Sequence, residues 1–350
     1  MSSEHDTDGT AIDRAQAVAE TSQALGEMIM GFRVTQMIYV AAKLDIAGLL
    51  SSGPRSVQEL ARTTGTHRPS LYRLLRALAS LGIFAQQEDG RFVLTPLAGL
   101  LQSGVPGSQR SRALNYGEHY TWSEWGELLH SVTTGETAAN HLHGMDHWEL
   151  RERNPELGAI FNDMMTDTTS SQAASIAEAY DFSEIGTLVD VGGGRGALIA
   201  AILQANPYLH GIVCDAPHVV QGARPTLEAA GVLDRCELAP CDFFASVPDG
   251  DAHILKMIIH DWDDERSTAI LKSCRRAMPA HGRILLVEHV ILPGNEPQPG
   301  KLLDLQMLVG LGGQERTKEE YGDLLARAGF KLTRVVPTRG EVSIIEARPA

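Results

Sequence analysis

The stretch Thr187-Leu-Val-Asp-Val-Gly-Gly-Gly-Arg-Gly-Ala-Leu-Ile-Ala-Ala-Ile-Leu203 decides the fold of the chain. Its apolar, β-branched run from Leu188 to Val191 predicts a buried strand, its glycines predict a tight turn, and Ala197 to Leu203 predicts a helix that begins at once. Glycine suits the turn because a side chain would hold a ligand away from the backbone, and because positive φ angles carry little steric cost without a Cβ. The stretch therefore predicts a strand-turn-helix unit with a ligand at the turn.

A second strand is predicted at Gly211-Ile-Val-Cys-Asp215. It ends in a carboxylate, where nucleotide-binding α/β folds grip a ribose. Gly192, Gly194 and Ala197 also satisfy the G-x-G-x-x-[GA] dinucleotide pattern, which leaves NAD open as a cofactor. However, Asp190 would repel a pyrophosphate and suits a cofactor that carries a positive charge or an amino group. S-adenosylmethionine carries both, so we expect it in preference to NAD; the plain alternative is that Asp190 only caps the turn.

Composition and charge restrict the class of protein. The chain has 350 residues, of which 43% are hydrophobic, enough for two domains with a sizeable core. It has no apolar run of about eighteen residues, and residues 1–13 are polar and acidic, so we expect a cytoplasmic protein without a membrane partner. The formal net charge of −14 argues against nucleic acid as the main partner, because phosphate binding draws on an excess of Lys and Arg.

The cysteines do not predict a zinc site. They lack paired C-x-x-C spacing and fall in or near predicted core elements, so we expect reduced, structural thiols at Cys214, Cys236, Cys241 and Cys274.

The first part of the chain predicts a dimerisation domain. Ala17 to Leu50 is helical in pattern with few polar gaps, and a helix that is apolar on more than one face is buried on more than one side. A second copy of the chain is the expected partner, although packing within its own domain is the alternative. Ser56-Val-Gln-Glu59 predicts a capping box, and a helix beginning near Pro69 and a hairpin turning at Glu88-Asp-Gly90 follow it. This order is the winged-helix layout.

A DNA-binding regulator is the rival hypothesis for this domain. Arg68, Arg73 and Arg76 decorate the second helix, as they would in a protein that inserts it into a major groove. The rest of the chain is acidic, so we expect dimerisation or lid formation instead.

The last part of the chain predicts a Rossmann-like, doubly wound α/β sheet, because strands and helices continue to alternate after the glycine turn. The further predicted elements are Ile254–Ile259, Glu265–Ala277, Gly282–Glu288, Lys318–Ala328, Lys331–Val336 and Glu341–Glu346. We expect four segments: a disordered tail (1–15), a winged-helix-like dimerisation domain (16–105), connecting helices that line a substrate pocket (106–180) and a catalytic domain (181–350).

The connecting segment is rich in aromatic residues and histidines. His141-x-His143-x-x-x-His147 could be a metal site, but it lacks acidic ligands at helical spacing, so we expect no metal there. These rings suit the walls of a substrate pocket, or plain core packing. Phe161 and Met165 belong to an apolar stripe just before the cofactor strand and could line the same cleft.

Reactive groups are predicted at the carboxyl ends of the strands, where ligands gather in such folds. Asp242 and Phe243 offer a carboxylate for an exocyclic amine and a ring for stacking. His260 follows an apolar strand and Glu288 ends the next one, which is the arrangement of a general base oriented by an acid. The plain alternative for His260 is a satisfied core histidine.

Five segments in order resemble the motifs of one family. They look like those of the S-adenosylmethionine-dependent O-methyltransferases of the plant caffeate type and their bacterial relatives in natural-product pathways. The segments are Asp190-Val-Gly-Gly-Gly-Arg-Gly196, Cys214-Asp-Ala-Pro-His218, Cys241-Asp-Phe-Phe244, His260-Asp-Trp-Asp-Asp-Glu265 and Gly312-Gly-Gln-Glu-Arg-Thr317. The resemblance covers nearly the whole chain, including the winged-helix segment, which in that family mediates dimerisation.

The resemblance implies roles for individual residues. For the cofactor, it implies that Gly192 and Gly194 approach the methionine moiety, Asp215 holds the ribose hydroxyls, Asp242 and Phe243 hold the adenine, and Lys256 and Trp262 flank the cofactor. For catalysis, His260 matches the base, and Glu288 and Glu315 match the two acids beside it. The expected pocket residues are Phe161, Met165, Met307 and Leu311. Thr168 and Gly310 depart from the plant pattern, so the plant substrates are not carried over.

Together these features predict a homodimeric, metal-independent enzyme that transfers the methyl group of S-adenosylmethionine to a hydroxyl of an aromatic small molecule, a secondary metabolite. The alternatives within the fold are an N-methyltransferase or a relative that does not methylate. The more distant alternative is an NAD-dependent oxidoreductase.

Overall fold

The computed structural model describes residues 6–350, which divide into two compact units, the first ending at Glu118 and the second beginning at His119. Of the predicted tail (1–15), residues 1–5 lie outside the described residues, and the rest belongs to helix α1 (Asp6–Lys43). The first unit runs past the predicted boundary at residue 105 because α6 (Arg110–Gly117) packs against α1.

The first unit contains the predicted helix-turn-helix and hairpin. Its other elements are α2 (Ile46–Leu50), α3 (Val57–Thr64), α4 (Arg68–Ser80), β1 (Phe84–Gln86), β2 (Phe92–Leu94) and α5 (Pro96–Gly99). The capping box is confirmed: the Ser56 hydroxyl accepts from the Glu59 amide, and the Glu59 carboxylate accepts from the Ser56 amide. Strands β1 and β2 pair antiparallel, and Phe84 and Phe92 close the small core.

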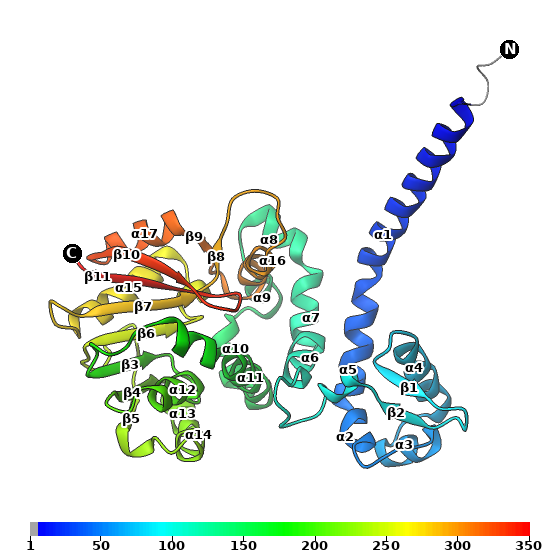
Figure 1. The fold of residues 1–350 in the computed structure, drawn as a ribbon, viewed down its shortest axis with the longest axis horizontal. Helices are drawn as coiled ribbons and strands as arrows, with labels where there is room; N and C mark the ends of the chain where they lie inside the picture. Colours follow the sequence, from blue (N-terminus) through cyan, green and yellow to red (C-terminus); the bar gives the residue numbers. More distant parts are fainter. Residues whose placement is uncertain (1–5) are drawn as a thin grey trace. The chain divides into compact units, whose positions relative to one another are not determined.

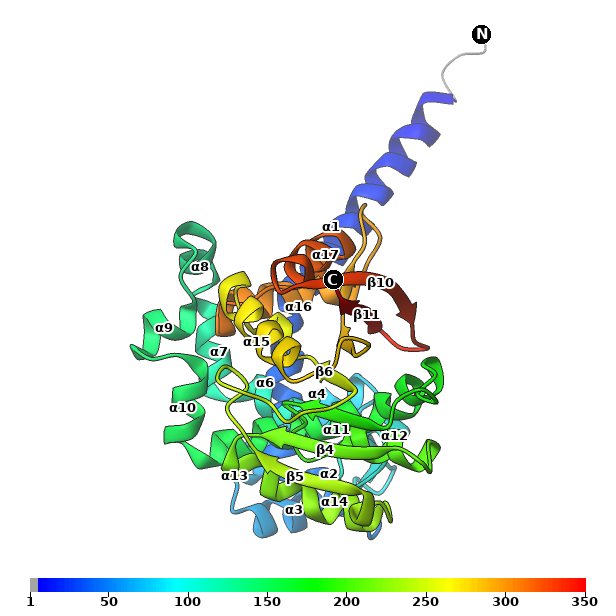
Figure 2. The same ribbon diagram turned by 90° about the vertical axis from the view of Figure 1, so that its left-hand side faces the viewer.

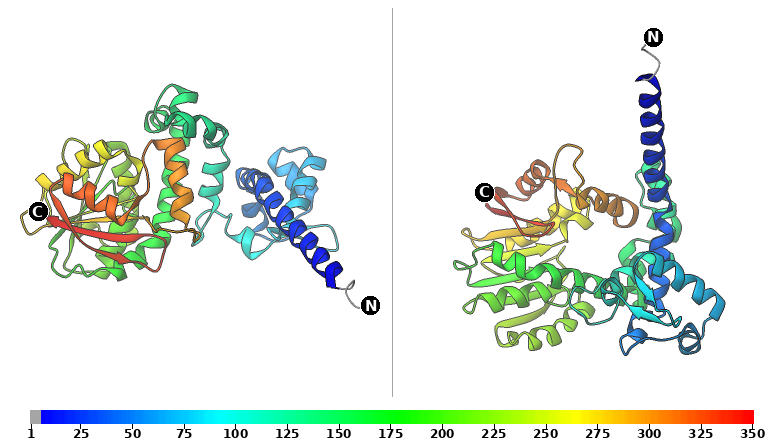
Figure 3. Two further views of the ribbon diagram at one scale, coloured as in Figure 1. Left: turned by 90° about the horizontal axis from the view of Figure 1, so that it is seen from above. Right: turned by 45° about the vertical axis from the view of Figure 1, so that its right-hand side comes forward.

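Helix α1 carries uncovered apolar side chains. Met28 is 78% exposed, Ile29 60% and Phe32 52%, whereas Ala41 and Ala42 near its carboxyl end are buried in this unit. Figure 3 shows the helix extending beyond the other elements of its unit. A contiguous apolar surface of this kind marks an interaction site.

In the described part of the second unit, seven strands form one sheet (Figure 1) in the order β10-β11-β7-β6-β3-β4-β5. Their bounds are β3 (Thr187–Val191), β4 (His210–Asp215), β5 (Cys236–Pro240), β6 (Ala252–Lys256), β7 (Arg283–Glu288), β10 (Phe330–Pro337) and β11 (Ser343–Pro349). Strands β3 to β7 pair in parallel, and β11 pairs antiparallel with both β7 and β10. The predicted doubly wound sheet is therefore confirmed.

Two apolar layers cover the sheet, because successive side chains of a strand point to opposite faces. Leu188 and its equivalents pack under α11 (Pro155–Ala179), α12 (Ala197–Ala205), α13 (Pro217–Val220) and α14 (Arg224–Ala229). Val189 and its equivalents pack under α15 (Asp264–Arg276) and α17 (Lys318–Arg327). Figure 2 shows α12 and α15 on different sides of the strands.

The chain order places a switch point between β3 and β6. From β3 the chain proceeds to β4 and β5 on one side, and then returns to place β6 and β7 on the other. Ligands bind at the carboxyl ends of the strands at such a point. The glycine turn follows β3 there, and the segment that carries His260 follows β6.

Short elements complete the second unit. They are α7 (His119–Gly126), α8 (Leu128–Thr134), α9 (Ala138–His143), α10 (His147–Arg153), α16 (Pro299–Gln306), the strand pair β8 (Val290–Ile291) and β9 (Arg316–Thr317), the 3-10 turns η1 (Gln221–Ala223), η2 (Leu233–Arg235) and η3 (Ile259–Asp261), and the π-helical segment η4 (Met307–Leu311). Within residues 6–350, no helix has both the length and the apolar character needed to cross a bilayer.

Candidate functional site

The predicted glycine turn is confirmed in its geometry. Gly192, Gly194 and Gly196 have φ angles of 70°, 57° and 72°, which side chains rarely adopt. Gly192 also lies against Ile258, since an added Cβ would come within 2.4 Å of the Ile258 Cδ1 atom. The turn brings β3, α12 and the end of β6 into close contact.

Asp190 lies buried beneath this turn. Burial and the charge of Asp215 raise the pKa of its carboxyl to about 7. Its Oδ2 atom has no hydrogen-bond partner among the described residues. A buried, unpartnered carboxylate oxygen suits a ligand that brings a donor or a positive charge.

Asp215 is held in place at the end of β4. Its Oδ2 accepts from the Gly194 amide at 2.8 Å and its Oδ1 from the Ala216 amide at 2.7 Å. Each carboxylate oxygen has a second lone pair, so the group can still accept from a hydroxyl. The ribose-binding role of Asp215 stays a prediction.

The expectation of four reduced thiols is wrong for two of them. Cys214 and Cys241 form a disulfide, with their Cα atoms 5.7 Å apart, whereas Cys236 and Cys274 are buried free thiols. The spacing of 27 residues concealed the pair, but β4 and β5 are parallel neighbours whose carboxyl ends meet. The disulfide thus joins the residue before Asp215 to the residue before Asp242.

The predicted adenine residues lie in an aromatic cluster after β5. Asp242 is exposed, and its Oδ1 accepts from the Phe244 amide. The half-buried Phe243 lies 6.3 Å from the Trp262 ring, and Phe244 meets the same ring edge-on at 4.9 Å. The structure therefore brings Asp242, Phe243 and Trp262 together.

Lys256 ends β6 as a buried ammonium. Its Nζ donates to the Thr169 hydroxyl of α11 at 3.3 Å. Burial lowers the pKa of Lys256 to about 8, against the charges of Glu288 and Asp190, which raise it. The side chain therefore balances carboxylates of β3 and β7 beside the turn.

We expected His260 at the end of its strand, but β6 already stops at Lys256, and Met257 adopts a φ of 55°. The backbone turns there, and His260 lies in η3 with its side chain buried. Its Nδ1 lies 2.6 Å from Glu315 Oε1, and its Nε2 lies 3.2 Å from Asp261 Oδ1. Both ring nitrogens therefore face carboxyl groups.

Glu288 does not orient the ring by the bond that the strand pattern predicted. Its Oε1 accepts from the backbone amides of Ile258 and Ile259, at 3.1 and 2.9 Å, and thereby fixes the turn before His260. One ligand atom each of His260, Glu288 and Glu315 nevertheless lies within 4.8 Å of the others. The two acids that the resemblance implied do flank the histidine, and Glu315 makes the contact.

Burial keeps this cluster partly protonated. It raises the pKa of Glu315 to about 8, with help from the charge of Asp304. It also raises the pKa values of Asp261 and Glu288 to about 7, while the charge of His260 lowers both. The acids therefore gain charge as the imidazole gains a proton.

Sequence reasoning missed two contributors. Asp261 had no assigned role, although it is adjacent to His260. Arg316, only 1% exposed, donates to the Ile259 and Trp262 carbonyls and to Asp264, which holds the loop around His260 in place. Arg316 follows Glu315 directly in the motif Gly312–Thr317, and this position could have indicated its role.

The four predicted pocket residues lie in two elements. Phe161 and Met165 are half-buried on α11, and Met307 and Leu311 delimit η4. Phe161 meets the edges of His147 and Trp148, at ring distances of 6.2 and 5.8 Å. Trp148 stacks on Trp262 at 5.8 Å, which links these rings to the aromatic cluster.

The three histidines of the connecting segment do not gather on one point. His141 stacks on His130, His143 stacks on Tyr120, and His147 lies near Glu124.

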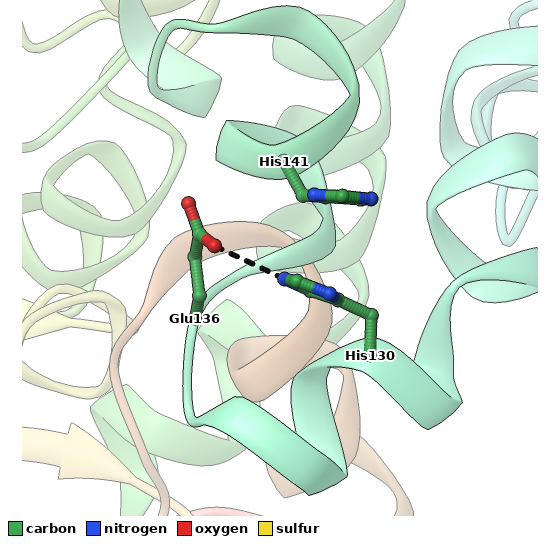
Figure 4. A group of neighbouring side chains, drawn as sticks. All are labelled: His130, Glu136 and His141. Carbon is green, nitrogen blue, oxygen red and sulfur yellow. Dashed lines mark hydrogen bonds and ion pairs between the residues drawn. The ribbon is translucent and has the colours of Figure 1, made fainter.

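His130, Glu136 and His141 do form a surface group, in which His130 contacts Glu136 at 3.0 Å (Figure 4). The two rings stack at 3.8 Å with an interplanar angle of 17°. Their lone pairs therefore lie in two nearly parallel planes, so a metal ion could not lie in the plane of both rings, as it does when two histidines bind it well.

Comparison with known proteins finds two family models that match the chain. A family model described as the O-methyltransferase domain matches residues 125–331, and another described as the O-methyltransferase dimerisation domain matches residues 27–104. The chain belongs to this O-methyltransferase family. It is therefore an S-adenosylmethionine-dependent methyltransferase, as the resemblance implied.

Three relatives show the range of the family. The phenazine O-methyltransferase of Lysobacter antibioticus is 48% identical over 97% of this methyltransferase and 99% of that protein. The 8-amino-8-demethylriboflavin N,N-dimethyltransferase of Streptomyces davaonensis is 33% identical over 93% and 95% of the two chains. An O-methyltransferase from neocarzinostatin biosynthesis, solved in complex with S-adenosylmethionine and 2-hydroxy-5-methyl naphthoic acid, has a TM-score of 0.79 at 32% identity, covering 91% of this chain and 96% of that one.

Proposed function

We propose that this methyltransferase transfers a methyl group to a hydroxyl oxygen of an aromatic natural product, with His260 accepting the hydroxyl proton. The observation that carries the proposal is the contact of 2.6 Å between His260 Nδ1 and Glu315 Oε1.

The residues around the glycine turn fit S-adenosylmethionine, which when bound supplies an electrophilic methyl group on a sulfonium. Asp190 has an unpartnered oxygen, Asp215 keeps lone pairs for ribose hydroxyls, and Phe243 presents a ring near Trp262. Relatives in this fold are solved with the same molecule. We therefore assign Asp190, Gly192, Gly194, Asp215, Asp242, Phe243, Lys256 and Trp262 to its site.

His260 suits proton removal from a hydroxyl. A phenol titrates near pH ~10 and imidazole near ~6.5, so complete proton transfer before methyl attack is uphill by roughly 5 kcal/mol. Removal of the proton during the attack avoids this cost. Glu315 fixes the Nδ1–H tautomer, so that Nε2 is the basic nitrogen and the nearby carboxyls stabilise the imidazolium. The acceptor hydroxyl must replace Asp261 as the partner of His260 Nε2.

The buried base favours oxygen over nitrogen as the acceptor atom. A neutral amine attacks with its own lone pair and releases its proton afterwards, whereas a hydroxyl gains most of its nucleophilicity from proton removal. N-methylation remains the alternative, since the relatives include an N,N-dimethyltransferase. We propose that no metal takes part, because the imidazole and the carboxyls supply the proton chemistry.

We propose a homodimer formed through the first unit. The dimerisation-domain model covers most of this unit, and the apolar side chains of α1 lie uncovered in one copy. We place the enzyme in the cytoplasm and propose that neither nucleic acid nor a membrane is its partner. The net charge of −14 disfavours nucleic acid, because phosphate binding draws on an excess of Lys and Arg.

The test is replacement of the base. His260→Ala should lower kcat by about 10² to 10⁴, as loss of a general base does, while the Kd for S-adenosylhomocysteine stays within about threefold. His253→Asn is the matched control, because His253 is a buried histidine of β6 whose Nε2 bonds the Pro248 carbonyl, away from His260. It should lower the Tm without lowering kcat. Turnover by His260→Ala at the wild-type rate would refute the assignment of the base, and loss of activity on addition of EDTA would refute metal independence.

A further inference from the structure

Glu124 is a buried acid that the proposed mechanism does not use. It lies on α7 with 0% exposure, and neither carboxylate oxygen has a hydrogen-bond partner among the described residues. Burial raises the pKa of Glu124 to about 7, although the charge of Arg151 lowers it. Buried polar groups in folded proteins are nearly always hydrogen-bonded, so an acid without a partner indicates a missing one.

Other unpartnered polar atoms surround this acid. His147 Nδ1 lies 3.9 Å from Glu124 Oε1, too far for a hydrogen bond, and has no other partner among the described residues. The Tyr120 hydroxyl and His143 Nε2 are also buried without a partner in the described structure, and their rings stack at 4.3 Å. Four side chains from α7, α9 and α10 thus leave polar atoms in one region.

Gly310 lies close to this acid. A Cβ at this position would lie 3.2 Å from Gln306 Nε2, 3.6 Å from Glu124 Oε2 and 3.7 Å from His147 Nδ1. Gly310 belongs to η4, between the predicted pocket residues Met307 and Leu311. The glycine therefore lets the backbone of η4 approach both polar groups closely, between two predicted pocket residues.

The polar groups are linked to the catalytic end. His147 meets Phe161 edge-on, and η4 packs against both α7 and η3, which carries His260. The charge of Arg151 lowers the pKa values of both Glu124 and Asp261, so one guanidinium acts on both acids. The polar groups and the catalytic histidine thus contact the same element, which also carries two predicted pocket residues.

We propose that Glu124 and His147 form a second polar subsite for the acceptor, and that the acceptor is a fused aromatic molecule with a further hydroxyl or amino group besides the hydroxyl that is methylated. This inference rests on the proposed function for the position of the reacting hydroxyl. The second group donates to Glu124 and meets Nδ1 of His147. An acceptor without it leaves the buried acid unpaired, which costs binding energy.

The test compares binding of model acceptors to the complex of the enzyme with S-adenosylhomocysteine. Isothermal titration gives the Kd values of the dihydroxynaphthalene isomers and of 1-naphthol and 2-naphthol. We expect at least one isomer to bind about 10-fold or more tighter than both naphthols, the effect of one hydrogen bond to a charged group. Glu124→Met should reduce this preference to below about threefold, and Glu124→Gln should keep part of it because its amide oxygen still accepts.

Glu127→Met is the matched control. Glu127 is half-buried, three residues after Glu124 between α7 and α8, and outside the group of unpartnered atoms. It should keep the full preference, and a Tm for each variant confirms folding. The proposal is overturned if none of the compounds binds or if no isomer binds better than the naphthols. It is also overturned if Glu124→Met keeps the preference, the result expected when only ordered water pairs with the acid. Preferential binding without a methylated product on incubation with S-adenosylmethionine would refute the O-methylation and leave the subsite standing.

Discussion

Replacement of Glu315 by Gln tests which acid supports the base. The two acids beside His260 are matched, because each has one bonded and one unpartnered oxygen in the described structure. Glu315→Gln removes a charge from the His260 contact. Glu288→Gln keeps an amide oxygen for the Ile258 and Ile259 amides, and so keeps the turn. The strand pattern indicated Glu288 as the orienting acid, whereas the structure indicates Glu315.

The expected magnitude follows from the contact. A hydrogen bond to a charged group contributes about 1.5–3 kcal/mol. If the variant loses this stabilisation of the imidazolium in the transition state, kcat falls by about 10- to 150-fold, because each ~1.36 kcal/mol is a factor of ten in rate. Glu288→Gln should stay within about threefold, since the bonds of its carboxylate go to backbone amides.

The pH dependence gives the effect a sign. Burial raises the pKa of Glu315 to about 8, so its carboxylate forms only as the pH rises through that value. Below about pH 7 the protonated acid is as neutral as glutamine. The deficit of Glu315→Gln should therefore be small at pH 6.5 and reach its full value near pH 9. Single-turnover rates with labelled S-adenosylmethionine at saturating acceptor measure it, and equal rates for Glu315→Gln and wild type at pH 9, or a slower Glu288→Gln, would refute the reasoning.

Two further predictions concern the disulfide and the first unit. Reduction of Cys214–Cys241 by a phosphine should weaken S-adenosylhomocysteine binding by about 2- to 10-fold, because the loop of Asp242 and Phe243 must then be ordered on binding. The Cys214→Ala/Cys241→Ala double variant should bind with this weaker affinity and show no response to reductant. An unchanged Kd on reduction of the wild type would show that the disulfide is not needed. Met28→Glu combined with Ile29→Glu should convert a dimer to monomers in light scattering, since both side chains lie uncovered on α1. The control Leu129→Glu changes an exposed leucine on α8 of the second unit and should leave the dimer intact. A dimer that survives the α1 changes would place the interface elsewhere.

The sequence predicted the parts of the fold that depend on local pattern. The strands around Leu188, Val213 and Leu285 are apolar runs bounded by glycine or polar residues, and the structure has each of them. The capping box at Ser56 was predictable because it requires only two residues three positions apart. These features arise within a few residues of the chain.

The features that the sequence alone did not predict depend on contacts between distant segments. Glu315 bonds a histidine 55 residues away, and only the resemblance to a family indicated it. The disulfide needed the register of β4 and β5, and the early end of β6 needed the positive φ of Met257. No pattern within a single segment encodes these pairings.

The distribution of charge at the strand ends argues for the donor more strongly than the glycine turn does. Asp190, Asp261, Glu288 and Glu315 are all buried there, and burial raises the pKa of each because no sufficient positive charge lies nearby. Lys256 is the buried ammonium among them, and Arg316 is engaged by Asp264 and by backbone carbonyls. A pyrophosphate would add negative charge to this region and raise these pKa values further, whereas a cation lowers them and is itself stabilised. The same charges favour a cationic donor over its neutral product, so the acids that help the donor to bind also weaken retention of the product once its charge is lost.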